Sequence, residues 1–203
     1  MDDKSKLMLS EEELEIVNNT KWILTKQDII QKVYQQFSNM VPEIRKEFLN
    51  AGIQFPDKII SAIPKISRGE NYNGLPYVLL DYPSVFDKDE MFAFRTMFWW
   101  GNFFSVSLLL SGKYKDLFAE KILAKSVEFS KDLFICVHDN PWQHHFEQTN
   151  YIVFYNFEKT QVEDLINQKD FLKIALKFEL KQWNNIDSLL KDACNKLISL
   201  IKD

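Results

Sequence analysis

The stretch MFAFRTMFWWGNFFSVSLLLS, residues 91–111, concentrates more large apolar side chains than any other part of the chain. Gly101 and Asn102 interrupt it at its centre, and a glycine in first position suits the two-residue loop of a type II′ β-hairpin. The sequence therefore predicts two antiparallel strands, near 91–100 and 103–111, buried at the middle of one domain.

A transmembrane helix is the competing interpretation, because a membrane span needs ~20 mainly apolar residues and this stretch is about that long. Arg95, Thr96, Gly101, Asn102 and three serines fall inside it, however. We therefore favour the hairpin and expect no membrane partner.

A two-residue loop also sets the expected register of the hairpin, in which Trp100 pairs with Phe103 and Arg95 lies opposite Leu108. This register places Arg95 on the more apolar face and the hydroxyls of Ser105 and Ser107 on the other, beside Trp100. Because both faces are apolar, both need cover, and we expect the helices at the two ends of the chain to supply it.

Helical patterns dominate the two ends of the chain. Ser10 with Glu13 and Thr25 with Asp28 match the capping box, and apolar residues then recur in steps of three and four as far as Phe48. A third box, Thr160 with Glu163, precedes a similar stripe in the last part of the chain: Trp183, Ile186, Leu190, Ala193, Leu197 and Ile201. The sequence thus predicts helical segments over 1–60 and 161–202.

Between these segments, apolar runs separated by turn residues indicate strands. The expected strands lie near 64–69, 76–82, 91–100, 103–111, 132–138 and 150–157, with a short helix near 114–126. The predicted fold is a single α+β domain, residues 1–203. It has an antiparallel, largely meander β-sheet of about six strands, centred on the hairpin 91–111 and flanked by N-terminal and C-terminal helices.

Composition narrows the classes of protein. A net charge of −4 over 203 residues argues against a general nucleic-acid binder, which needs a basic surface. The acidic N-terminus lacks the apolar core of a signal peptide, so we expect a soluble protein in the cytoplasm. Cys136 and Cys194 lack CxxC spacing and are expected to be buried free thiols, although a disulfide between them stays open.

Arg95 is the most informative charge, because a guanidinium on an apolar sheet face must be paired or must line a cavity that receives an anion or a carbonyl group. Asp81, on the preceding strand, is the nearest partner. Trp100, Ser105 and Ser107 combine an aromatic wall with hydroxyls, as in the lining of a small-molecule site. Both a structural Arg95–Asp81 pair and a ligand site formed by these five residues are open.

All three histidines fall in one short segment, as His138, His144 and His145, close to Asp139 and Glu147. Two imidazoles and a carboxylate could hold a divalent metal if the segment folded back on itself. Their spacing does not match HEXXH, which places two histidines one helical turn apart. A polar, exposed loop is the alternative.

The serine-hydrolase and nucleotide-binding motifs GxSxG, GxGxxG and the Walker loop are all absent from the sequence. The favoured hypothesis is a non-enzymatic binding or interaction module for a small molecule or a protein, with no cofactor. The alternative is a metal-dependent hydrolase that uses His138, His144 or His145, and Glu147 or Asp139. A homo-oligomer that uses the C-terminal helix as its interface is a third possibility.

Overall fold

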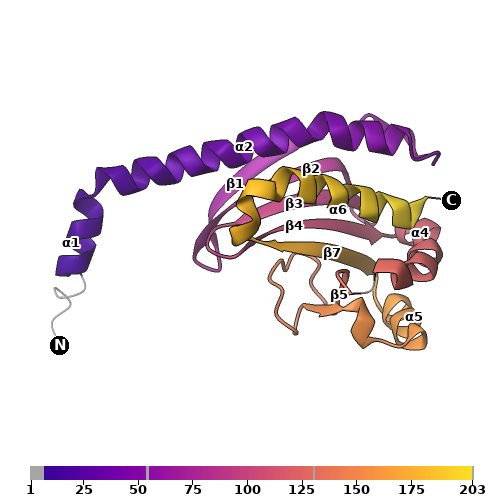
Figure 1. Ribbon diagram of the computed structural model, residues 1–203. Coiled ribbons are helices and arrows are strands. Elements are labelled where there is room, and N and C mark those ends of the chain that lie inside the picture. Colours follow the sequence, from indigo (N-terminus) through magenta and orange to yellow (C-terminus); the bar gives the residue numbers. More distant parts are fainter. Residues whose placement is uncertain (1–6, 54, 130, 203) are drawn as a thin grey trace.

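Figure 1 shows the computed structural model of the chain, which describes residues 7–53, 55–129 and 131–202. One antiparallel sheet of seven strands forms its centre, with helices at both ends of the chain, so the predicted α+β class is confirmed. The strands are β1 (Lys65–Tyr72), β2 (Leu75–Phe86), β3 (Met91–Trp99), β4 (Phe103–Ser111), β5 (Phe134–Cys136), β6 (Tyr151–Val153) and β7 (Phe171–Glu179). Their order across the sheet is β1-β2-β3-β4-β7-β5-β6, so only β7 departs from a meander.

The helices lie largely where the sequence predicts them. They are α1 (Glu11–Asn18), α2 (Thr20–Leu49), α3 (Asp57–Ile60), α4 (Lys113–Lys125), α5 (Lys159–Gln168) and α6 (Ile186–Ile201), with 3₁₀ turns at Ser126–Phe129, Phe154–Asn156 and Leu180–Asn185. The prediction of helix over 1–60 includes residues 1–6 and 54, which lie outside the described residues. Within the described ranges, every helix falls short of the length or the apolarity needed to cross a membrane.

The long helix α2 begins earlier than predicted. Its N-cap is Asn19, whose side chain accepts a hydrogen bond from the Trp22 amide, whereas the sequence pattern suggested a start at Thr25. The helix continues through Pro42 to Leu49 without a break. A single α2 of 30 residues is about 45 Å long, and its N-terminal end projects beyond the sheet (Figure 1).

Helices α2 and α6 lie next to each other on one face of the sheet, and α4 packs at one end of this layer (Figure 1). The side of α2 that faces the sheet is buried from Ile30 through Phe37 to Phe48. It meets a sheet face built from apolar residues such as Phe94 and Leu108. This contact forms the main hydrophobic core.

The central hairpin is shifted by one residue from the predicted register. Trp99, not Trp100, pairs with Phe103, so the loop has three residues. The Asn102 amide donates to the Trp99 carbonyl at 3.0 Å, and Gly101 has φ 71°, as the third residue of a type II turn requires. The prediction of a two-residue type II′ loop is therefore wrong.

This shift changes which side chains share a face, since a slip of one residue turns a strand over. Arg95 pairs with Ser107 rather than Leu108, and so shares its face with Ser105 and Ser107. Thr96 lies instead on the face that the helices cover. The predicted separation of Arg95 from the serine hydroxyls is wrong.

Strand β7 corrects the prediction that 161–202 is helical throughout. The segment 171–179 pairs with β4 along one edge and with β5 along the other. Its apolar residues Leu172, Ile174 and Leu176 alternate with period two, but Leu, Ala and Lys also suit a helix. Pairing on both edges decides between the two.

Helices do not cover both faces of the sheet, as the sequence analysis expected. The face that carries Arg95 is covered by residues 137–150, which connect β5 to β6 without regular structure. Both of these strands are shorter than predicted, with three residues each. The covering segment, hereafter the cover loop, contains all three histidines.

Candidate functional site

The centre of the covered face is an ion pair between β3 and β2. Arg95 and Asp81 are direct cross-strand partners, with Nε to Oδ1 at 2.6 Å and Nη2 to Oδ2 at 2.9 Å. Asp81 is only 5% exposed. The two parallel bonds are the bidentate geometry that favours arginine for carboxylate recognition.

His144 and Trp142 of the cover loop complete the surroundings of Arg95. The Nη1 atom lies 3.3 Å from Nε2 of His144, and the Trp142 ring lies 5.6 Å from the guanidinium carbon. Burial lowers the pKa of His144 well below 6.5, and the charges of Lys173 and Arg95 lower it further. The imidazole is therefore neutral near pH 7 and its Nε2 can accept a hydrogen bond from Arg95. Each guanidinium nitrogen thus has a partner from the protein, as in a structural ion pair.

Tyr72, at the end of β1, ties the cover loop to the far edge of the sheet. Its hydroxyl accepts hydrogen bonds from the amides of His144, at 2.7 Å, and His145, at 3.1 Å. It also donates to the side chain of Gln143 at 3.3 Å. One phenol therefore fixes three consecutive residues of the loop.

Lys173 holds the same loop from β7. The side chain is 2% exposed, and its ammonium nitrogen lies 2.7 Å from the carbonyl oxygens of both Pro141 and Gln143. Burial lowers the pKa of Lys173 to about 7, and the charge of Arg95 contributes. The lysine donates to two loop carbonyls from a position next to the Cys136 thiol, whose pKa burial raises.

Aromatic packing closes the rest of this face. Phe146 of the cover loop stacks on Tyr151 with ring centroids 4.5 Å apart, and it meets Phe103 and Phe134 edge-on at 5.0 and 4.9 Å. Asn150 reaches back to the His145 carbonyl at 2.5 Å. The packing of the Phe146 ring thus anchors the cover loop in addition to its hydrogen bonds.

The three histidines have separate surroundings. His138 accepts the Asn140 amide at its Nδ1, 2.9 Å away, while His144 faces Arg95. His145 has Nδ1 3.9 Å from a carboxylate oxygen of the exposed Glu147. Among the described residues, no three His, Cys, Asp or Glu side chains gather closely enough to hold a metal ion.

Asp139, the other carboxylate of the metal hypothesis, pairs with Lys169 at 2.8 Å. This ion pair lowers the pKa of Asp139. Lys169 also donates to the His138 carbonyl at 3.1 Å. Asp139 and His144 therefore attach the loop to the protein through Lys169 and Arg95, whereas His138 and His145 contact residues of the loop itself.

Of the five residues predicted to bind a ligand, the structure brings four together. Arg95, Asp81, Ser105 and Ser107 share the covered face. Trp100 is separated from them, because it lies in the hairpin loop and packs against the helix-covered core. Cys136 and Cys194 are buried free thiols, as expected.

The sequence analysis missed Tyr72 and Lys173, two of the residues that hold the cover loop. Lys173 was placed on a helix, so its position on the Arg95 face could not be deduced. The signal was present in FLKIALKF, where lysines at 173 and 177 alternate with apolar residues. Tyr72 carried no signal, because its partners are more than 70 positions away in the chain.

The apolar stripe of the C-terminal helix, which the sequence suggested as an oligomer interface, is already buried within the single chain. Its apolar stripe, for example Leu190, Ala193 and Leu197, is buried against α2 and the sheet within one chain. The stripe belongs to the core of the subunit. The homo-oligomer stays a prediction, and a second copy that binds this helix would have to contact its outward side.

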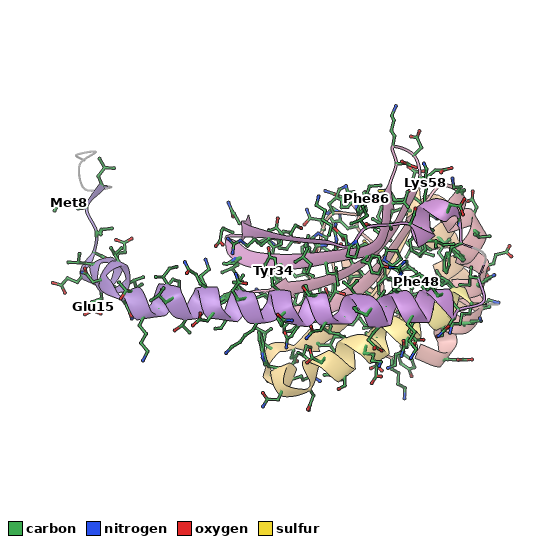
Figure 2. All side chains as sticks on the ribbon, turned by 90° about the horizontal axis from the view of Figure 1, so that it is seen from above. Met8, Glu15, Tyr34, Phe48, Lys58 and Phe86 are labelled. Atoms are coloured by element: carbon green, nitrogen blue, oxygen red, sulfur yellow. The ribbon has the colours of Figure 1, made fainter. Side chains whose placement is uncertain are left out.

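The most exposed apolar surface is at the other end of the chain. We define the N-terminal arm as residues 7–25, namely α1, the residues before it and the first turns of α2. Figure 2 shows Met8 and Glu15 on this arm, clear of the body, whereas Tyr34 and Phe48 lie along the part of α2 that crosses the sheet. Nine large apolar side chains of the arm are 41% to 88% exposed: Leu7, Met8, Leu9, Leu14, Ile16, Val17, Trp22, Ile23 and Leu24.

A groove between α2 and α6 is a second surface at which another molecule could bind. It has a volume of about 260 Å³, an apolar floor of Met40, Ile44 and Cys194, and a polar rim. Gln36 and Asn195 are among its lining residues, and their side-chain oxygens are buried without a hydrogen-bond partner in the described part of the chain.

No family model, curated protein or solved structure matches this chain.

Proposed function

We propose that this chain is a non-enzymatic protein-interaction module whose contact surface is the N-terminal arm. The observation that carries the proposal is the density of apolar side chains on the arm. Of the 17 large apolar residues that are exposed among the described residues, nine fall within its 19 positions. Such a density of exposed apolar side chains is uncommon in a soluble monomer, and exposed apolar surface of this extent marks sites of association.

The secondary structure of the arm supports the same conclusion. None of the eight residues of α1, all of them in the described part of the chain, is buried. Its capping box of Ser10 and Glu13 stabilises the first turn. A helix shorter than about 12 residues is nonetheless marginal in water unless its apolar side is packed. A protein partner that covers Leu14 and Val17 would supply that packing.

The cover loop explains why the arm is preferred to the Arg95 face. On that face the loop occupies the space above Arg95, and Tyr72 and Lys173 hold it in place. The arm, in contrast, is open to a partner without any rearrangement. The small-molecule hypothesis at Arg95 would require the loop to move.

The experiment compares two double variants of the full chain, purified under native conditions from the cells that produce it. One, Leu14→Lys with Val17→Lys, disrupts the arm. The control, Ile63→Lys with Tyr155→Lys, changes two equally exposed apolar residues elsewhere. We measure the native mass and the stoichiometry of the purified material.

We expect the wild type and the control to form an assembly larger than the 24.1 kDa chain, and the arm variant to be a single chain with an unchanged melting temperature. Two results would contradict the proposal. One is an assembly that survives in the arm variant, and the other is a wild-type chain that purifies alone.

A further inference from the structure

We infer that Arg95 and Lys173 form a binding site for the carboxylate of a small molecule, and that the cover loop is the lid of this site. With the lid closed, atoms of the loop occupy the positions that the carboxylate oxygens would take, so the lid has to open before the ligand binds. The cover loop lies on the side of the sheet opposite α2 and α6 (Figure 1). The site shares no residue with the N-terminal arm and is independent of the proposed function.

The register of the sheet brings the two cations together. Asp81, Arg95, Ser107 and Ala175 are successive cross-strand partners on β2, β3, β4 and β7. Lys173 precedes Ala175 by two residues along β7, so its side chain is on the same face of the sheet. Two long cationic side chains therefore stand on either side of two small residues.

The charge of this face is not balanced when Lys173 is protonated. Asp81 has both carboxylate oxygens bonded to Arg95. Lys173 pairs with no carboxylate among the described residues, although its side chain is only 2% exposed. A buried cation without a counter-charge is unfavourable, and burial and the nearby charge of Arg95 lower the pKa of Lys173. One negative charge from a ligand would restore the balance.

The cover loop supplies neutral acceptors in place of an anion. The ammonium nitrogen of Lys173 lies 2.7 Å from the carbonyl oxygens of Pro141 and Gln143. Nη1 of Arg95 lies 3.3 Å from Nε2 of His144. All three acceptors belong to one short stretch of the loop, so a single movement of this stretch frees both cations. A carboxylate that bonds to both would form charge-assisted hydrogen bonds, which are stronger than those to neutral acceptors.

Two serine hydroxyls provide independent support for a polar ligand. Ser105 and Ser107 are each 6% exposed, and neither hydroxyl forms a hydrogen bond with another described residue. Buried polar groups normally have a partner. Ser107 lies on the strand next to Arg95, between the two cations, where its hydroxyl could donate to a bound carboxylate.

The cover loop is attached in a way that allows it to open. It has no regular secondary structure, and its ends meet where the Val137 amide donates to the Asn150 carbonyl at 2.8 Å. Surface loops with adjacent ends are often functional. Between those ends, side chains such as Tyr72 and Lys173 hold the loop on the sheet. The loop can therefore lift off the face without breaking the pairing of any strand.

The test uses the full chain with Tyr72→Phe, which removes the acceptor of two lid amides, and sodium acetate as the probe. Sodium chloride at the same ionic strength and pH is the reference. We measure amide hydrogen exchange at His144 and His145, and the broadening of the NMR signal of ¹³C-labelled acetate. We expect acetate to bind saturably and to accelerate exchange, because bound acetate holds the lid open. The wild type should need at least about 5-fold more acetate, because its lid is open for a smaller fraction of the time.

Three further changes are made in the Tyr72→Phe chain. Ser107→Ala should weaken acetate binding about 3- to 10-fold without loss of stability, because its hydroxyl has no partner while the lid is closed. Lys173→Met should abolish the broadening of the acetate signal. The control Lys46→Met removes an exposed lysine of α2, on the other face of the sheet, and should change neither measurement.

Three outcomes would overturn the inference. They are acetate that neither broadens nor accelerates exchange in the Tyr72→Phe chain at any concentration, acetate binding that survives Lys173→Met, and a larger response to inorganic phosphate than to acetate. None of these bears on the arm, because the test of the arm measures the mass of the native assembly and uses no anion. The two proposals can therefore fail separately.

Discussion

The guanidinium of Arg95 meets the carboxylate of Asp81 directly across β3 and β2, through two parallel hydrogen bonds of 2.6 and 2.9 Å. Both side chains are largely withdrawn from water, with 13% and 7% exposure. The cost of removing water from two charges offsets much of their attraction, so such a pair adds little net stability. Removing only one of the two side chains, in contrast, leaves a buried charge without a partner and is strongly destabilising.

Asp81→Ala should lower the free energy of unfolding by about 3–5 kcal/mol, because it leaves the Arg95 guanidinium buried without a counter-charge. The double variant Asp81→Leu with Arg95→Met should lose much less than the two single changes together. Urea unfolding of Asp81→Ala, of the double variant and of its two single changes measures these losses. A loss below about 1 kcal/mol for Asp81→Ala would show that the guanidinium reaches water.

Tyr72→Phe should detach the cover loop from β1 while leaving the aromatic packing in place. The amides of His144 and His145 lose their acceptor, at a cost of about 1–3 kcal/mol if they remain buried. Amide hydrogen exchange should therefore accelerate at these two residues and stay unchanged in β3 and β4. Unchanged exchange at both histidines would mean that other contacts alone hold the loop.

Lys173 should make stability depend on pH between about 7 and 9. Its pKa falls from 10.5 in the unfolded chain to about 7 in the folded one, so the unfolded chain binds more protons within this window. The free energy of unfolding should therefore rise with pH, by up to about 1.4 kcal/mol per pH unit. Above pH 9 the raised pKa of Cys136 acts in the opposite direction, since the unfolded thiol loses its proton first.

Lys173→Met provides the control for this prediction. The variant lacks the titrating amine, so its unfolding free energy should have a smaller slope against pH from 7 to 9, whatever its absolute stability. Denaturant unfolding at several pH values measures both slopes. Equal slopes for the variant and the wild type would mean that Lys173 remains protonated in the fold throughout this range.

Thr96→Val should leave stability unchanged or raise it by about 1 kcal/mol. The Thr96 hydroxyl is buried and has no hydrogen-bond partner among the described residues, and valine has nearly the same shape. Thermal or urea unfolding tests this directly. A loss of more than about 1 kcal/mol would indicate a bound water at the hydroxyl, because a water bridge would be lost with it.

The periodicity of apolar residues was sufficient to predict the class of the fold. The stripe through Ile30, Phe37 and Phe48 has one clear helical period, because α2 buries one side, and the apolar run 91–111, broken at Gly101 and Asn102, identified the central hairpin. The Arg95–Asp81 pair was one of two interpretations that the sequence left open, because Asp81 on the preceding strand was the nearest partner. These features depend on residues that are close in the sequence.

The rest depends on contacts between distant parts of the chain. The three-residue loop at Trp100 differs from a two-residue loop by a single position, and this difference moved Ser105 and Ser107 to the face of Arg95. Strand β7 is specified by pairing with β4, some 70 residues earlier, more than by its own propensities. The exposure of Trp22 could not be deduced from the sequence either, because an apolar helical segment has the same pattern of residues whether or not another element covers it.

The most direct test of the arm as a contact surface is amide hydrogen exchange of α1 in the natively purified wild-type assembly and in the variant Leu14→Lys with Val17→Lys. No residue of α1 is buried within the chain, so α1 of the variant should exchange almost as fast as an unfolded peptide. We predict that α1 is protected from exchange in the wild-type assembly. Exchange in α1 that is equally fast in the wild-type assembly and in the variant would contradict the account.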